Sequence, residues 1–286
     1  MIYEWDTMSI NNSIIFGDNL TILKTFPDAC IDLIYIDPPF NTGKPRKKVT
    51  LKTDKDMAGT RIGFGDNRYR SQEIKEYSFD DRYSSYPDFL NPRLVEAYRI
   101  LKDTGSILVH LDYREVHYCK VFLDSLFGRA CFQNEIIWAY DFGARSKKCW
   151  PAKHDNILWY SKDPKRYTFN YDEIDRVPYL APSLVGKVKA ARGKTITDVH
   201  WHTIVPTNGK EKTGYPTQKP LGLLRRFVRV HSNPGEILMD FFCGSGTLGE
   251  AAGEAGRSFV LVDNNLEAVG ITSKRLSKYA PTLINF

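Results

Sequence analysis

The sequence predicts an α/β protein with a doubly wound, mostly parallel sheet. The apolar run LIYI (33–36) is continuous rather than alternating, which is typical of a strand buried on both faces. Strand patterns like this one alternate with amphipathic helical patterns along most of the chain. Such alternation indicates a parallel sheet with helices on both faces.

The first half of the chain begins with strand SIIFGD (13–18), a helix from about Asn19 to Phe26 that Asp18 can cap, and strand DLIYID (32–37). After a polar stretch, the pattern predicts helix 86–103 with Gly105 as its stop, strand 106–112, helix 114–127 before Gly128, and strand 132–140. These elements are enough for one side of a sheet.

The last part of the chain repeats the alternation. It predicts helix 220–232, strand 236–242, a glycine turn, helix 247–256, strand 258–263 and a helix from about Asn265 to Tyr279. No linker with a shift in composition separates this part from the first, so we expect one sheet built from both ends of the sequence.

Two segments interrupt the alternation. Residues 41–86 are polar and basic with no clear period, which predicts a mobile or function-bearing loop. Residues 141–215 interleave basic and aromatic residues around a strand NILWYSK (156–162), and we expect most of them to lie outside the main sheet. The predicted organisation is therefore a first half, 1–140, an inserted region, 141–215, and a second half, 216–286, that completes the sheet.

The bulk properties describe an ordinary folded protein. The 286 residues are 42% hydrophobic and carry a formal net charge of +6, which suits a polyanionic partner without requiring one. The five cysteines form no CxxC pair, so neither a disulfide framework nor a metal site is indicated. The first residues resemble no signal peptide, and no apolar run approaches the ~20 residues of a membrane span, so we expect a cytoplasmic protein without a membrane partner.

A glycine turn follows the predicted strand 236–242. Gly244-x-Gly246-x-x-Gly249 opens a helix, and Asp263 ends the next strand. Glycines let the backbone approach a ligand closely, and an acid roughly 20 residues further on can accept both hydroxyls of a ribose. Since the chain has only one helix after Asp263, and Asp240 and Phe242 can meet an amine and an apolar chain, we predict a free nucleoside cofactor such as S-adenosylmethionine.

A second motif, Asp37-Pro38-Pro39-Phe40, ends strand 32–37. The prolines fix the direction of their carbonyls, and a carboxylate beside a carbonyl can accept both hydrogens of an exocyclic amino group on a nucleobase. This arrangement would direct the nitrogen lone pair at an incoming methyl group, and Phe40 offers a face on which an extruded base can stack. The motif therefore predicts a catalytic site for amino methylation at the carboxyl end of a strand.

The order of the two motifs resembles that of the S-adenosylmethionine-dependent DNA amino-methyltransferases of the circularly permuted β group. There a DPPF-type motif precedes an FxGxG motif, as Asp37–Phe40 precede Phe242–Thr247 here. TQKP (217–220) resembles the segment before the cofactor strand, and FGDN (16–19) resembles the strand end that reaches the adenine ring of the cofactor. The resemblance covers nearly the whole chain and implies a Rossmann-like methyltransferase fold in permuted form.

The resemblance also implies functional residues and partners. The residues expected to bind S-adenosylmethionine are Asp18, Asp37, Lys219, Asp240, Phe242, Gly244, Gly246, Thr247, Asp263 and Asn264. An acid at the first position of the catalytic motif is associated mostly with adenine N6, so the expected reaction is methylation of adenine in a specific duplex DNA sequence by base flipping. A homodimer and a cognate restriction endonuclease are further partners found with such enzymes.

Basic residues near these motifs are candidates for DNA contacts. They are Lys44, Arg46, Lys47, Lys48, Arg145, Lys147, Lys148 and Arg192. The inserted region 141–215 corresponds to the target-recognition element of the β group. Three alternatives stay open at this point: a cytosine-N4 methyltransferase, a nicotinamide-dependent oxidoreductase, and a catalytically silent relative that only binds nucleic acid.

Overall fold

The computed structural model describes residues 10–44, 46–58, 60–62, 68–79, 81–143, 145–206 and 208–286. Two compact units make up the chain. The larger unit contains the chain up to Pro38 together with Ser85–Phe286, and the smaller unit contains Pro39–Ser84. Each unit is described below by itself.

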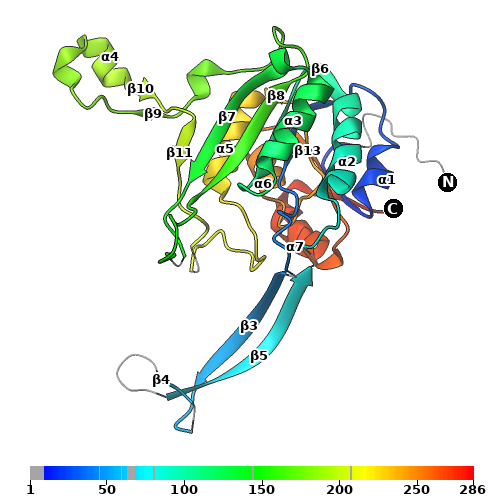
Figure 1. Cartoon of the computed structure of the whole chain (residues 1–286), viewed down its shortest axis with the longest axis vertical. Helices are drawn as coiled ribbons and strands as arrows, with labels where there is room; N and C mark the ends of the chain where they lie inside the picture. The colour runs from blue at the N-terminus through cyan, green and yellow to red at the C-terminus, as the bar shows by residue number, and fades with distance from the viewer. Residues whose placement is uncertain are drawn as a thin grey trace. The chain divides into compact units, whose positions relative to one another are not determined.

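The larger unit is built on one nine-stranded sheet (Figure 1). Its strands, in spatial order, are β11 (Val199–Trp201), β7 (Phe132–Ala139), β8 (His154–Ser161), β6 (Leu101–Leu111), β2 (Ile31–Ile36), β12 (Ile237–Asp240), β13 (Ser258–Asp263), β1 (Ser13–Phe16) and β14 (Thr282–Asn285). Every neighbouring pair is parallel except the two that β8 makes with β6 and β7. The predicted mostly parallel sheet, assembled from both ends of the sequence, is confirmed.

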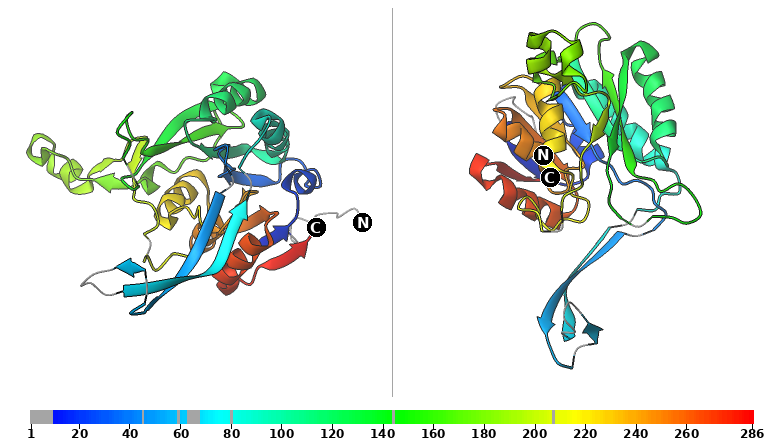
Figure 2. Two further views of the ribbon diagram at one scale, coloured as in Figure 1. Left: turned by 60° about the horizontal axis from the view of Figure 1, so that its bottom comes forward. Right: turned by 90° about the vertical axis from the view of Figure 1, so that its left-hand side faces the viewer.

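Helices cover both faces of this sheet (Figure 2, right). One face carries α1 (Asn19–Leu23), α2 (Tyr86–Ile100) and α3 (Val116–Phe127), and the other carries α5 (Leu221–His231), α6 (Thr247–Glu254) and α7 (Leu266–Leu276). All six residues of β2 are buried, as a strand covered on both faces requires. The doubly wound fold class is therefore confirmed.

Two helix ends follow the predicted sequence signals, and one differs from the prediction. Asp18 caps α1 by accepting a hydrogen bond from the backbone N–H of Thr21 at 2.9 Å, and Gly128, with φ +88°, ends α3. Helix α2, however, ends at Ile100 rather than near Gly105, which lies inside β6. A Cβ at Gly105 would lie 2.9 Å from the carbonyl oxygen of Asp32, so this glycine allows a close approach of β6 to β2 and is not a helix stop.

Residues 141–215 contribute two strands to the main sheet. Strand β8 lies in the middle of the main sheet, between β6 and β7, and β11 extends its edge. Outside the main sheet are η3 (Tyr171–Glu173), β9 (Arg176–Val177), η4 (Pro182–Leu184), α4 (Lys187–Arg192) and β10 (Lys194–Thr195). The apolar run of β8 is buried between helix-covered strands, and this non-local pairing has no signature in the sequence around it.

The smaller unit is a β-ribbon and not the predicted loop. Strands β3 (Arg46–Lys55) and β5 (Arg68–Phe79) pair antiparallel, and β4 (Arg61–Ile62) pairs with β5 at one end. At its base, the Asp81 carboxylate accepts hydrogen bonds from the backbone N–H groups of Asn41 and Thr42 at 2.8 and 3.1 Å. The sequences of β3 and β5 contain few apolar residues, so hydrophobic alternation long enough to predict a strand is absent from them.

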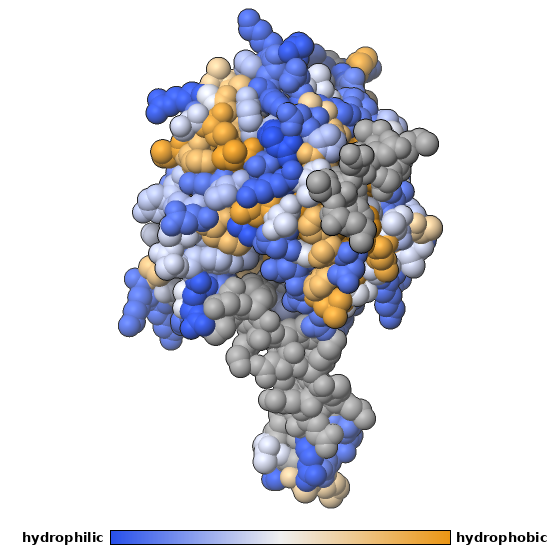
Figure 3. All heavy atoms as spheres, turned by 90° about the vertical axis from the view of Figure 1, so that its right-hand side faces the viewer, coloured by the Kyte–Doolittle hydropathy of each residue, from blue (hydrophilic) through white to orange (hydrophobic). Residues whose placement is uncertain are grey.

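The surface is mixed in character. On the face drawn in Figure 3, hydrophobic residues of the larger unit lie in small groups among hydrophilic ones, as is usual for globular proteins. In the part of the chain that the structure describes, none of the helices combines the length and the apolar character needed to cross a membrane.

Candidate active site

The two predicted motifs meet at one edge of the sheet. Strand β2 runs into Asp37, and β12, its parallel neighbour, ends at Asp240, with Leu33 paired to Leu238. Strand β13, which ends at Asp263, is the next parallel strand. Since neighbouring parallel strands end at the same edge, the three carboxylates come together where doubly wound sheets bind ligands.

Asp37 is held by a lysine from the second half of the chain. Its side chain is 15% exposed and forms an ion pair through Oδ2 with the Nζ of Lys219, which is 11% exposed. The carbonyl oxygen of Lys219 accepts a hydrogen bond from the Thr247 hydroxyl at 3.2 Å, which ties this lysine to the glycine turn. The buried Oδ1 of Asp37 has no hydrogen-bond partner among the described residues and is free to accept one.

The glycine turn is shaped by its own acid. The Asp263 carboxylate accepts hydrogen bonds from the backbone N–H groups of Gly244 and Asn265, at 2.8 and 2.9 Å. Gly244 and Gly246 have φ values of +50° and +69°, which favour glycine, and a Cβ on Gly246 would lie 2.6 Å from Cγ2 of Thr272. Both glycines are therefore required by the turn itself.

The carboxylates of Asp240 and Asp263 accept hydrogen bonds from backbone N–H groups and form no ion pair among the described residues. Burial raises the pKa of Asp240 well above its usual range, and the neighbouring charges of Asp37 and Asp263 raise it further, while a hydrogen bond from Phe242 and the charge of Lys219 lower it. Burial also raises the pKa of Asp263. A cationic ligand would relieve this repulsion, and S-adenosylmethionine, which carries a sulfonium and an ammonium group, fits that requirement.

Asp240→Asn is expected to stabilise the ligand-free protein at pH 7 by roughly 1–3 kcal/mol, because the amide removes the cost of ionising a buried carboxyl. Because the pKa is raised in the folded state, this cost is absent below the ordinary pKa of 3.8 and grows as the pH rises from there towards the raised pKa, so the gain should shrink towards pH 5. Urea unfolding at several pH values measures it, and isothermal titration should show at least tenfold weaker cofactor binding. A variant less stable than the wild type at pH 7 would contradict the account.

Asp18 and Asn19, which follow strand β1, make different contacts at this edge of the sheet. The Asp18 side chain is 51% exposed; burial raises its pKa, but hydrogen bonds from Thr21 and the charge of Arg93 outweigh this and lower it. Asn19, which the sequence did not single out, is buried and donates from Nδ2 to the carbonyl oxygen of Phe241 at 2.6 Å. Its Oδ1 accepts a hydrogen bond from Arg93, so Asn19 fixes the turn between β12 and α6.

The remaining predicted residues at this edge are residues of the two motifs and basic residues of the segment between β7 and β8. Pro38 and Thr247 are buried, Phe242 is partly buried with its ring 5.8 Å from that of Phe89, and Asn264 is exposed at the end of β13. Lys147 and Lys148 are exposed in the segment joining β7 to β8, at the same edge of the sheet as Asp37. Arg145, in the same segment, forms an ion pair with Asp141.

One predicted DNA contact, Arg192, does not lie at the edge of the sheet where Asp37 lies, and several other predicted residues belong to the smaller unit. Arg192 is the last residue of α4 and pairs with Asp172. Helix α4 lies in the segment between the end of β8 and the start of β11, and both of these strand ends are at the edge of the sheet opposite to Asp37. Pro39, Phe40 and Lys44 belong to the smaller unit. Arg46, Lys47 and Lys48 begin β3, and their side chains lie outside what the structure describes.

A buried polar network lies one strand away from Asp37. The Tyr35 hydroxyl hydrogen-bonds to Nδ1 of His110 at 2.8 Å, and Nε2 of His110 hydrogen-bonds to Asp155 at 3.1 Å. Asp155 also accepts from the Tyr140 hydroxyl at 3.1 Å. Burial raises the pKa of Asp155, but its bond to His110 and the charge of Lys219 outweigh this and lower it. The network joins β2, β6 and β8, and residue spacing in the sequence gives no sign of it.

Asp155→Ala is expected to destabilise the protein by about 2–4 kcal/mol, because His110 and Tyr140 would each lose their acceptor in the interior. Chemical denaturation measures the change. The control Asp28→Ala removes an exposed carboxylate and should change stability by less than about 0.5 kcal/mol. Equal effects of the two substitutions would show that the network contributes nothing.

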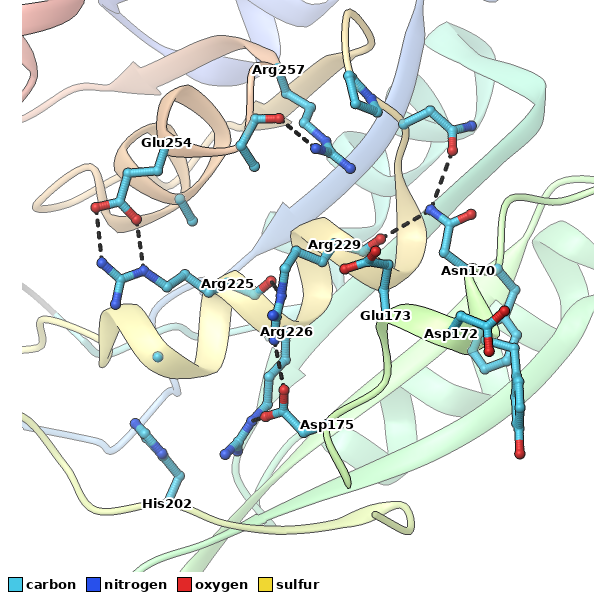
Figure 4. Close-up of a pocket in the computed structure, with 17 residues that line it drawn as sticks. Asn170, Asp172, Glu173, Asp175, His202, Arg225, Arg226, Arg229, Glu254 and Arg257 are labelled. Atoms are coloured by element: carbon cyan, nitrogen blue, oxygen red, sulfur yellow. Dashed lines mark hydrogen bonds and ion pairs between the residues drawn. The ribbon is translucent and has the colours of Figure 1, made fainter. Parts of the chain in front are cut away.

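The pocket drawn in Figure 4 is a separate feature. It has a volume of about 1040 Å³ and is lined by α5, α6 and η3, without any of the predicted catalytic or cofactor residues. Three of its four arginines are held by carboxylates: Arg226 and Arg229 bind Asp175, and Arg225 binds Glu254 through two hydrogen bonds. The fourth, Arg257, donates to the backbone carbonyls of Ala255 and Ser232.

Comparison with known proteins agrees with the arrangement of motifs and fold. Residues 31–274 match the model of the N6/N4 family described as DNA methylase. The chain is 30% identical over 268 residues to the type II methyltransferase M.HpaI of Haemophilus parainfluenzae, covering 93% of this chain and 74% of that protein. It is also 30% identical over 277 residues to the DNA adenine methyltransferase YhdJ of Escherichia coli K12, covering 92% and 82%.

Solved structures share the fold. The complex of M1.HpyAVI with S-adenosylmethionine superposes with a TM-score of 0.60 at 20% identity, covering 92% of this chain and 98% of that one. The cytosine-N4-specific PvuII DNA methyltransferase gives a TM-score of 0.62 at 18% identity, covering 93% and 86%. The fold and the edge where the motifs meet thus define an S-adenosylmethionine-dependent methyltransferase. The chain belongs to the N6/N4 family of DNA methylases.

Proposed function

We propose that this DNA methyltransferase modifies the N6 amino group of adenine in a specific duplex sequence, after extruding the base. The observation that supports it most is the Asp37 carboxylate, whose buried Oδ1 has no partner among the described residues and which lies at the strand end beside the glycine turn. An acid at this position favours adenine in the group that the chain resembles. One of the two relatives is named an adenine methyltransferase.

Asp37 and Pro38 would activate the base. The lone pair of an exocyclic amino nitrogen is delocalised into the ring, which makes it a poor nucleophile. If the Asp37 carboxylate and the Pro38 carbonyl accept the two N–H hydrogens, the nitrogen becomes pyramidal and its lone pair turns out of the ring. Asp37 can then take the proton that the nitrogen must lose, and Phe40 would stack on the extruded base.

The cofactor would lie along the ends of β12 and β13. When bound, it supplies an electrophilic methyl group. Asp240 would hold its ammonium group and Asp263 its ribose hydroxyls, over the backbone of Gly244 and Gly246. Lys219, now paired with Asp37, would bind the carboxylate of the methionine end, and this exchange of partners would release Asp37 for the base.

Family membership decides against a nicotinamide-dependent oxidoreductase. The cytosine-N4 alternative is resolved by one experiment. Duplex DNA is incubated with the protein and methyl-labelled S-adenosylmethionine, then digested to nucleosides and separated by chromatography. Label in N6-methyl-2′-deoxyadenosine supports the proposal, and label in N4-methyl-2′-deoxycytidine contradicts its adenine half. A cytoplasmic location, a homodimer and a cognate endonuclease stay predictions.

A further inference from the structure

The register of the ribbon assigns its residues to two faces. Strands β3 and β5 pair from Arg46 opposite Phe79 to Lys55 opposite Tyr69. In an antiparallel pair, residues directly opposite each other share a face, and successive residues alternate between faces. The strand β4 extends the same assignment, with Arg61 opposite Tyr69 and Ile62 opposite Arg68.

Positive charge is concentrated at the register positions of one face, named here the cationic face. Its charged residues are Arg46, Lys48, Lys52, Arg68, Arg70, Lys75 and the acid Asp54. The other, mixed face has as charged residues Lys47, Lys55, Arg61, Glu73 and Glu76. Arg70 also pairs with Asp56 at 3.0 Å, just beyond β3. The two faces therefore differ clearly in charge although they belong to the same strands.

A β-bulge produces this segregation. Thr50 pairs with Lys75 but Leu51 pairs with Glu73, so the ladder skips Ile74. With regular pairing beyond Lys75, Glu73 would fall on the cationic face, and Arg68 and Arg70 on the mixed face. The bulge exchanges these residues of β5, which removes an acid from the cationic face and adds two cations of β5 to it.

We propose that the cationic face binds the phosphates of duplex DNA while the ribbon lies in a major groove. This inference rests on the proposed function for its substrate. A major groove about 12 Å wide admits a two-stranded ribbon. The ten residues of β3, at about 3.3 Å each, span about one turn of the duplex. Phosphate contacts would position the enzyme on DNA without reading the sequence.

The inference revises the sequence-based set of DNA contacts. Arg46 and Lys48 stay in it, and Lys47 moves to the mixed face. The cations of the cationic face that were outside the predicted set join it: Lys52, Arg68, Arg70 and Lys75. The competing ligand is single-stranded DNA, because the aromatic residues Tyr77 and Phe79 belong to the cationic face and bases can stack on aromatic rings. Duplex and single-stranded probes distinguish the two.

The test compares two double variants that each remove two positive charges from the ribbon. Lys48→Gln with Lys52→Gln alters the cationic face, and Lys55→Gln with Arg61→Gln alters the mixed face as the matched control. Affinity for a duplex and for a single-stranded oligonucleotide is measured by fluorescence anisotropy between 50 and 300 mM salt. Unchanged cofactor binding shows that both variants are folded.

The cationic-face variant should bind the duplex roughly tenfold more weakly at moderate salt, and its slope of log affinity against log salt should fall by about 2, whereas the control keeps the wild-type slope. Equal losses in the two variants, no loss in the first, or a loss confined to the single strand would overturn the inference. A wild-type protein that transfers no methyl group to the same duplex would instead contradict the proposed function.

Discussion

Asp37→Asn is expected to lower the rate of methyl transfer by about 10²–10⁴-fold while DNA binding is retained. The oxygen of the asparagine amide can still accept one amino hydrogen, but the neutral amide is a weaker acceptor than the carboxylate and cannot take the proton that the nitrogen releases. Single-turnover transfer of labelled methyl to a duplex measures the rate, and anisotropy measures DNA affinity.

The control for this prediction is Asp172→Asn, which neutralises an exposed carboxylate far from the motif and should leave the rate within about twofold. Since Asp37 also holds Lys219, thermal melting must show that the variant is folded. A rate within tenfold of the wild type would remove Asp37 from the chemistry. A wild-type protein that binds DNA but transfers no methyl group would instead identify the catalytically silent alternative.

Gly246→Ala is expected to weaken cofactor binding at least 100-fold and to lower stability by about 2–4 kcal/mol. Its φ of +69° costs a residue with a Cβ roughly 1 kcal/mol, and the added carbon would lie 2.6 Å from Cγ2 of Thr272. Because Thr272 donates to the Gly244 carbonyl at 2.9 Å, relief of the clash would distort the turn itself. Calorimetric titration with S-adenosylmethionine and urea unfolding measure the two effects.

A second substitution separates the clash from the backbone strain. Thr272→Ser removes the Cγ2 atom and keeps the hydroxyl, so combined with Gly246→Ala it should restore part of the stability and of the affinity. Gly270→Ala in α7 is the control, because a Cβ there meets nothing within 4 Å and no loss is expected. If the double variant is no better than Gly246→Ala alone, the clash is not the cause.

The sequence predicted the features whose signals are local. The strand before Asp37 is a continuous apolar run, and Gly244 and Gly246 stand where the backbone needs positive φ, so both motifs and their common edge follow from short stretches. Asp18 shows the limit of such signals, because the same carboxylate caps α1 and pairs with Arg93. A role at the cofactor has to be compatible with that structural one.

The features that the sequence did not predict depend on distant pairing. Strand β8 became part of the main sheet through β6 and β7, which flank it in space. Asn19 is bonded to Phe241, and Asp155 to His110, across long stretches of chain. The ribbon is stabilised by cross-strand hydrogen bonds between polar strands, and such pairing is set by register and not by hydrophobic periodicity.

A crystal structure of the protein with a non-transferring analogue of S-adenosylmethionine and a duplex containing the target sequence tests the central claim most directly. The account predicts the analogue over Gly244 and Gly246, an everted adenine whose N6 lies within about 3.2 Å of the Asp37 carboxylate, and Lys219 released from Asp37. An analogue bound elsewhere, or a target base that approaches the cofactor without contact to Asp37, would contradict it.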